Sequence, residues 1–221
     1  MCSSDLACAT TSPVVRQQCF NPDRQLAAVL TPLEDLRAKG CTLEDAKTGQ
    51  TRCDSLRQEL SRLTVVCPAH APTLLADAVI SYDERQTVRA QQLLDQVLMM
   101  TGPHPDAAAL RGRIAIEEGN LPYARRLLEQ QLRVSPDSAA LHETYGAALY
   151  MNKQLPEAQK ELTMAGALGA PMWRIAYHLG LVAEAAGRLD EARQRYTEAV
   201  SGNPGWALAQ SRLTALRAQT R

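Results

Sequence analysis

The chain has 221 residues, of which 45% are hydrophobic and 22% are charged, a composition typical of a folded globular protein. With one Phe, two Trp and six Tyr, its core must consist mainly of aliphatic side chains, which favours helices and excludes an all-β sandwich or barrel. The 24 basic and 24 acidic residues balance, so no nucleic-acid partner is expected, and no apolar run approaches the roughly 20 residues of a membrane-spanning helix.

The first residues resemble the start of a mature bacterial lipoprotein. Cys2 is followed by Ser3, Ser4 and Asp5, and no signal peptide precedes it. The resemblance implies that Cys2 carries a lipid, that Met1 is an addition to the mature chain, and that the serine suits sorting to the outer membrane. The lipobox that would precede the cysteine is absent from this sequence.

The cysteines are distributed unevenly, because all of them lie in the first 67 residues. They are Cys2, Cys8, Cys19, Cys41, Cys53 and Cys67. None forms a Cys-x-x-Cys pair, which argues against a zinc site or a thioredoxin-type motif. Structural disulfides are therefore favoured, and with them an oxidising compartment such as the periplasm. Six reduced thiols in a cytosolic protein are the alternative.

Two helices are expected before residue 70. Leucines recur at helical spacing over residues 23–38 and again over 51–66, and Lys39-Gly40 and the residues around Gly49 are stop signals. A short turn of helix at 43–46 fits between them. This region, residues 1–70, is thus a cysteine-rich helical hairpin.

The hairpin suggests two disulfides. Folding it about its middle brings Cys19 near Cys67, which is the preferred pair. Cys41 reaches Cys53 only if the chain reverses at Gly49, because a continuous helix would separate them by about 18 Å. Six cysteines allow fifteen pairings, and the sequence alone does not choose among them.

A 34-residue repeat organises the rest of the chain. Two sets of small residues recur at this spacing: Gly112, Gly146 and Gly180, and Ala124, Ala158 and Ala192. The same register aligns Gly119 with Gly187 at a turn between helices. The pattern resembles the tetratricopeptide repeat, in which small residues at positions 8 and 20 let the two helices of a repeat approach closely. Each glycine is therefore expected to pack near the alanine twelve residues later.

The repeat frame predicts an all-α fold, a right-handed α-solenoid of antiparallel helix hairpins. It comprises a degenerate repeat at 71–104, regular repeats at 105–138, 139–172 and 173–206, and a capping helix over 207–221. In the last repeat, helices are expected over 173–186 and from about 189 to 200. The family's large residue at position 11 is replaced in this chain, for example by Ser81 and Ala115, so the core has a low volume.

Sequence motifs for catalysis are absent. The histidines form no metal-binding pair, and the chain has no phosphate-binding loop and no Gly-x-Ser-x-Gly elbow. We therefore expect no enzyme, no metal and no cofactor. The family resemblance implies instead that a concave groove binds a protein or peptide.

The resemblance to the family implies which repeat positions line the groove. They are Tyr82, Arg113, Glu117, Glu143, Tyr150, Met151, Arg174, Tyr177, His178 and Glu184. Tyrosine supplies contact area and arginine binds carboxylates through two hydrogen bonds, so these two residue types are the strongest candidates. Arg174 and His178 resemble part of the clamp with which some members hold a C-terminal carboxylate. Because the rest of that clamp is missing, chaperone tails are not expected as ligands.

Three classes of function remain open at this point. The first is a scaffold of the Gram-negative cell envelope, anchored to the outer membrane and assisting assembly of a pilus, a secretion system or a similar machine. The second is a cytosolic adaptor or cochaperone with reduced cysteines. The third is a redox or metal-handling protein whose cysteine-rich region is the active part.

Overall fold

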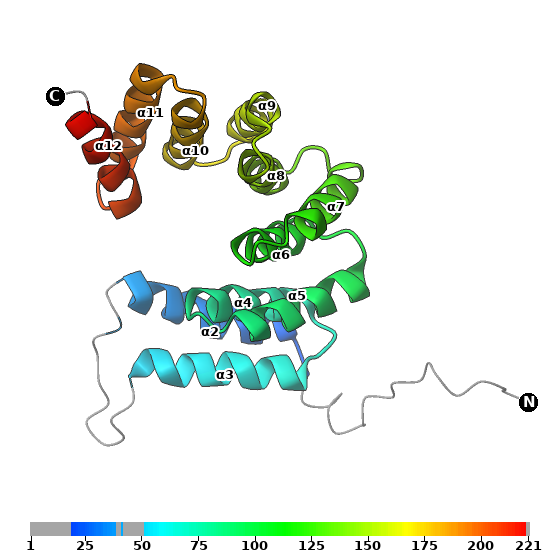
Figure 1. Cartoon of the computed structure of the whole chain (residues 1–221). Coiled ribbons are helices and arrows are strands. Elements are labelled where there is room, and N and C mark those ends of the chain that lie inside the picture. Colours follow the sequence, from blue (N-terminus) through cyan, green and yellow to red (C-terminus); the bar gives the residue numbers. More distant parts are fainter. Residues whose placement is uncertain (1–18, 39–40, 42–50, 220–221) are drawn as a thin grey trace, which may run out of the picture. The chain divides into compact units, whose positions relative to one another are not determined.

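The structure is a computed structural model that describes residues 19–38, 41 and 51–219. Eleven helices and no strand are present in these residues, as the composition predicts. The chain divides into two compact units, Met1–Met100 and Thr101–Arg221 (Figure 1). The degenerate repeat at 71–104 is thus grouped mainly with the N-terminal helices. The candidate lipid site Cys2 and the expected turn at 43–46 lie outside the described residues.

Unit 1 contains four helices that pack through aliphatic stripes. They are α2 (Pro22–Ala38), α3 (Arg52–Val66), α4 (Ala71–Asp83) and α5 (Thr87–Thr101). The first two match the predicted hairpin to within one residue. Its core combines Leu26, Val29 and Leu33 with Leu56, Leu60, Leu63 and Ile80. The members on α2 and α3 recur every three or four positions, which is the spacing of one helix face, and Ile80 is added from α4.

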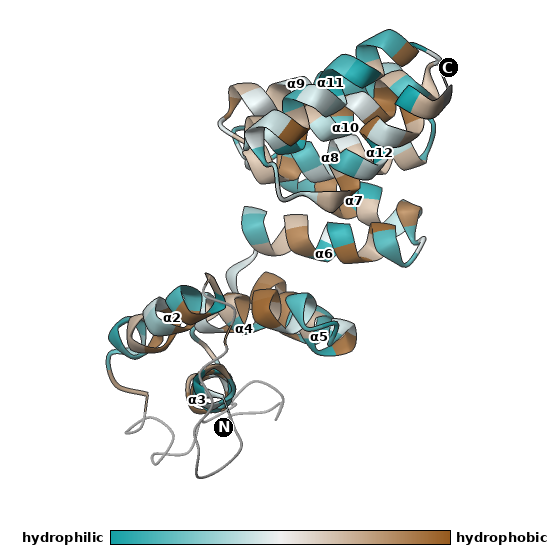
Figure 2. Cartoon of the chain, turned by 90° about the vertical axis from the view of Figure 1, so that its left-hand side faces the viewer, coloured by the Kyte–Doolittle hydropathy of each residue, from teal (hydrophilic) through white to brown (hydrophobic). Residues whose placement is uncertain are grey.

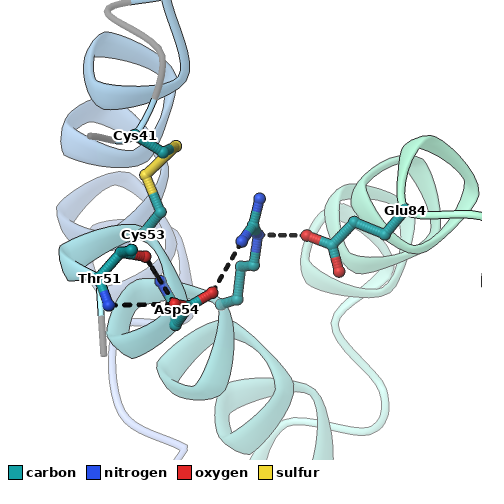
Figure 3. The surroundings of a disulfide bond; sticks show 6 residues. Cys41, Thr51, Cys53, Asp54 and Glu84 are labelled. Atoms are coloured by element: carbon teal, nitrogen blue, oxygen red, sulfur yellow. Dashed lines mark hydrogen bonds and ion pairs between the residues drawn. A yellow bond between two sulfur atoms is a disulfide. The ribbon is translucent and has the colours of Figure 1, made fainter. Parts of the chain in front are cut away.

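Two disulfides join the ends of the hairpin. Cys19 is bonded to Cys67 and Cys41 to Cys53, the two pairs considered from the sequence. The second bond lies beside the start of α3, where Thr51 caps the helix by accepting a hydrogen bond from the backbone N–H of Asp54 (Figure 3). The Asp54 carboxylate accepts in turn from the Thr51 backbone N–H, which completes a capping box.

Unit 2 is a row of helix hairpins closed by one further helix. Its helices are α6 (Pro105–Glu117), α7 (Leu121–Leu132), α8 (Ala139–Met151), α9 (Leu155–Ala167), α10 (Met172–Ala185), α11 (Leu189–Gly202) and α12 (Ala207–Gln219). We call the side formed by α6, α8, α10 and α12 the inner face, and the side formed by α7, α9 and α11 the outer face (Figure 1). The helices of this unit carry both hydrophilic and hydrophobic residues (Figure 2).

The helices of each hairpin cross where a glycine leaves no room for a side chain. A Cβ added to Gly180 would lie 2.5 Å from the Tyr196 ring, and one added to Gly146 would lie 2.8 Å from Leu162. The side chains that crowd these glycines lie sixteen residues later, at Leu128, Leu162 and Tyr196, and not at the alanines expected twelve residues later; the Ala158 carbonyl oxygen comes close as well, 3.3 Å from a Cβ added to Gly146. The alanines Ala124, Ala158 and Ala192 are fully buried. The glycines of the repeat are therefore required by close helix packing.

The turns between paired helices share one backbone conformation. Residues with positive φ recur every 34 positions at Arg85, Gly119, Lys153 and Gly187, with φ between 60° and 77°. Glycine adopts this conformation without strain, whereas a side chain costs about 1 kcal/mol there. The aligned glycines of the sequence thus mark only two of the four turns.

Replacing Gly180 by Ala should destabilise the chain by about 1–3 kcal/mol, because the added Cβ meets a ring that is fully buried. Gly166, in α9, is the matched control, since its nearest side-chain atom would lie 3.4 Å from the new Cβ. Gly166→Ala should stabilise by about 0.5–1 kcal/mol through helix propensity. Urea unfolding measures both, and equal effects of the two substitutions would contradict the packing described.

Candidate functional site

Nine of the ten predicted groove residues lie in unit 2, on three helices of the inner face. They are Arg113 and Glu117 on α6, Glu143, Tyr150 and Met151 on α8, and Arg174, Tyr177, His178 and Glu184 on α10. The tenth, Tyr82, is half-buried on α4 of unit 1. The nine residues differ greatly in burial and in their contacts.

Glu143 is the most buried charged group of the inner face. Its side chain is only 3% exposed, and both carboxylate oxygens accept hydrogen bonds from Arg174, at 2.5 Å from Nε and 2.6 Å from Nη2. The Nε2 atom of His178 lies 3.4 Å from the same carboxylate. Glu143 therefore links α8 to α10 across two successive repeats, and its carboxylate is not exposed to a ligand.

The ionisation of Glu143 depends on these partners. Burial opposes the charged form, but the hydrogen bonds from His178 and Arg174 and their positive charge outweigh it and lower the pKa to about 2. Because the carboxylate stays ionised at neutral pH, it holds the Arg174 guanidinium in a fixed orientation. The remaining N–H donors of Arg174 are the part that a ligand could reach.

A second link joins α10 to the capping helix. The Glu184 carboxylate accepts from the Tyr196 hydroxyl at 2.6 Å and lies 3.4 Å from Nη1 of Arg212. Burial raises the pKa of Tyr196, and the hydrogen bond to Glu184 raises it further. Arg212 was not among the predicted site residues, yet the register offered a signal, because it lies 34 positions after His178. The capping helix thus adds a charged group to the inner face.

Tyr177 packs inside an aromatic cluster. Its ring centroid lies 4.5 Å from that of Trp206 and 5.8 Å from that of Tyr196, and Trp173 contacts Trp206 at 4.8 Å. Tyr177 itself is 9% exposed. Because Trp206 directly precedes α12, the contact between Tyr177 and Trp206 attaches α12 to α10.

Other predicted residues of the inner face remain accessible. Met151 is 52% exposed, and Tyr150 beside it is half-buried, so that burial raises the pKa of its hydroxyl. Arg113 is half-buried and has no hydrogen bond or ion pair to the described residues. Glu117 is exposed at the end of α6. These side chains form the surface that a partner would meet.

The described part of the chain contains no group of three or more potential ligands arranged to hold a metal ion. No described helix is long and apolar enough to cross a membrane.

Comparison with known proteins gives a partial sequence match and several structural matches. A sequence model described as tetratricopeptide repeat matches residues 81–142. A sequence search of curated proteins gives no match.

Solved structures share the fold. One chain of the APC/C hetero-tetramer Cut9–Hcn1 superposes with a TM-score of 0.69 at 13% identity, over 76% of this chain and 34% of that one. The present chain thus spans about a third of the length of that chain. The tetratricopeptide protein TTC0263 of Thermus thermophilus gives 0.69 at 19% identity, over 89% of this chain and 99% of that one. PilF of Pseudomonas aeruginosa gives 0.63 at 14% identity, over 90% and 92%.

The stability of the chain should fall as the pH drops from about 5 to 2. The pKa of Glu143 is about 2 in the folded chain against an ordinary 4.5, so its ionised form stabilises the fold above pH 4.5 and that contribution disappears as the pH falls toward 2. The difference corresponds to about 3 kcal/mol. Urea unfolding of Glu143→Gln across this range should show a flatter pH dependence.

Glu129→Gln is the control for this measurement. Hydrogen bonds from Tyr145 and Arg125 also lower the pKa of Glu129, but its side chain is 40% exposed. This variant should retain most of the acid sensitivity of the parent chain. If both variants keep it, Glu143 is not the group responsible.

Proposed function

We propose that the chain is a non-catalytic scaffold that binds a segment of a protein partner on the inner face of unit 2, because residues 81–142 match a tetratricopeptide-repeat model and a solved tetratricopeptide protein shares the fold. This face is supported as the binding site by a difference among its predicted residues. Glu143, Tyr177 and Glu184 are engaged in links between helices, whereas Arg113 has no hydrogen bond or ion pair to the described residues and Met151 is 52% exposed.

The accessible residues suit a protein segment with both apolar and polar groups. Met151 adapts its shape to different apolar side chains, and Tyr150 offers a rigid ring with a polar end. Arg113 is available to bind a carboxylate or a backbone carbonyl. A ligand of this kind matches a protein or peptide better than a small metabolite.

We further propose that the scaffold works in the cell envelope of a Gram-negative bacterium, assisting a pilus, a secretion system or a similar assembly. The Cys19–Cys67 and Cys41–Cys53 disulfides support an oxidising compartment. The lipoprotein-like sequence around Cys2 supports a membrane anchor. A cytosolic adaptor with reduced cysteines is the competing function.

Photocrosslinking in the native cells tests the binding face. A photoreactive amino acid at Met151 on α8 should crosslink to a specific partner, and the crosslink should weaken when Arg113 is replaced by Glu. Met164 on α9 is the matched control, because it is a methionine of similar exposure, 43%, on the outer face. Equal crosslinking from both positions, or from Met164 alone, would remove the inner face as the binding site.

Thiol alkylation of the protein from the same cells tests the compartment. Cys19, Cys41, Cys53 and Cys67 should react only after reduction, and intact mass should show a diacyl or triacyl addition at Cys2. Reaction of all six thiols without reduction, on an unlipidated chain, would favour the cytosolic adaptor. The crosslinking result does not depend on this outcome.

A further inference from the structure

The methionines of the described residues all lie at the surface. Met99, Met100, Met151, Met164 and Met172 are between 42% and 81% exposed, and the buried hydrophobic side chains of the described part include no methionine. Methionine is among the residue types most often found fully buried, so this distribution is unusual. It leaves the thioether sulfurs accessible to solutes and the described core independent of them.

An accessible thioether is a site of reversible oxidation. Hydrogen peroxide transfers one oxygen atom to the sulfur: the O–O bond breaks, an S–O bond forms, the sulfur is oxidised by two electrons and water is released. A methionine sulfoxide reductase, supplied with two electrons by thiols, reverses the step. Because no described methionine is buried, oxidation should leave the packing of the described core unchanged.

Met151 differs from the other methionines in its position. It is the last residue of α8 and follows Tyr150 on the inner face. Met164 lies on the outer helix α9, and the two methionines of α5 belong to unit 1. Met172 begins α10, but its sulfur is directed at α9, where it lies 3.4 Å from the position of a Cβ added to Gly166. Met151 is therefore the methionine whose oxidation changes the surface that a partner would meet.

We propose that Met151 is a site of reversible oxidation that weakens partner binding at the inner face, an inference that rests on the function proposed for that face. A thioether makes apolar contacts and accepts hydrogen bonds only weakly, whereas a sulfoxide is polar. Covering a polar group with the apolar part of a partner carries a desolvation cost that corresponds to about a tenfold loss of affinity. Binding is thus strong while Met151 is reduced and weak after its oxidation.

Peroxide treatment of the full chain tests the site itself. Peptide mass mapping should show that Met151 gains one oxygen atom in the folded chain at a rate within about fivefold of its rate in the urea-unfolded chain, because its side chain is exposed. The circular dichroism and the urea midpoint should not change on oxidation. A slower reaction of Met151 in the folded chain, or loss of helix on oxidation, would overturn the proposal.

Crosslinking from the neighbouring position tests the effect on binding. A photoreactive phenylalanine derivative at Tyr150 reports the partner in the native cells while Met151 stays in place, and each variant is compared with and without hydrogen peroxide. Peroxide should lower the crosslink about tenfold in the parent chain and in Met164→Leu, the matched control on α9. Met151→Leu has no oxidisable sulfur and should give the same crosslink with and without peroxide. Met151→Gln, which imitates the polarity of the sulfoxide, should give a weak crosslink in both conditions.

The outcomes separate this proposal from the one on which it rests. A crosslink that resists peroxide in the parent chain, or that peroxide lowers equally in the parent and in Met151→Leu, would overturn the role of Met151 and leave the binding face in place. Failure of both Tyr150 and Met151 to crosslink before oxidation would contradict the binding face and the role of Met151 together.

Discussion

The closeness of paired helices is the constraint on which unit 2 depends. At Gly146 and Gly180 an added Cβ would overlap a side chain of the facing helix. At this crossing the backbone of one helix therefore lies directly against a side chain of the other. This packing repeats every 34 residues and places the inner helices at a regular spacing. The spacing in turn brings a side chain of one inner helix within hydrogen-bond distance of the next, as Glu143 and Arg174 show.

These links between inner helices reduce the number of charged groups that the inner face can offer to a ligand. Glu143 binds Arg174 and Glu184 approaches Arg212, so two carboxylates that could have met a ligand instead hold successive helices together. Removing Arg174 is costly because the buried Glu143 carboxylate is then left without compensation. The binding capacity of this face therefore lies in the side chains that the links leave accessible, of which Met151 is the most exposed predicted residue of α8.

The sequence predicted much of the fold because its signals are local or periodic. Helix ends, the 34-residue spacing and the small residues at crossings follow from the order of residues alone. The burial of Glu143 did not, because its partner lies 31 positions away on another helix. The turn conformation at Lys153 was also missed, since only neighbouring repeats carry the glycine that signals it.

A double-mutant cycle on Glu143 and Arg174 tests most directly whether the inner face is built on buried links. Unfolding free energies of Glu143→Gln, Arg174→Gln and the double variant give the coupling between the two side chains. We predict a coupling of about 2 kcal/mol or more, because the Glu143 carboxylate is buried and accepts two hydrogen bonds from Arg174. A coupling near zero would contradict the account and would return Arg174 to the groups available for a ligand.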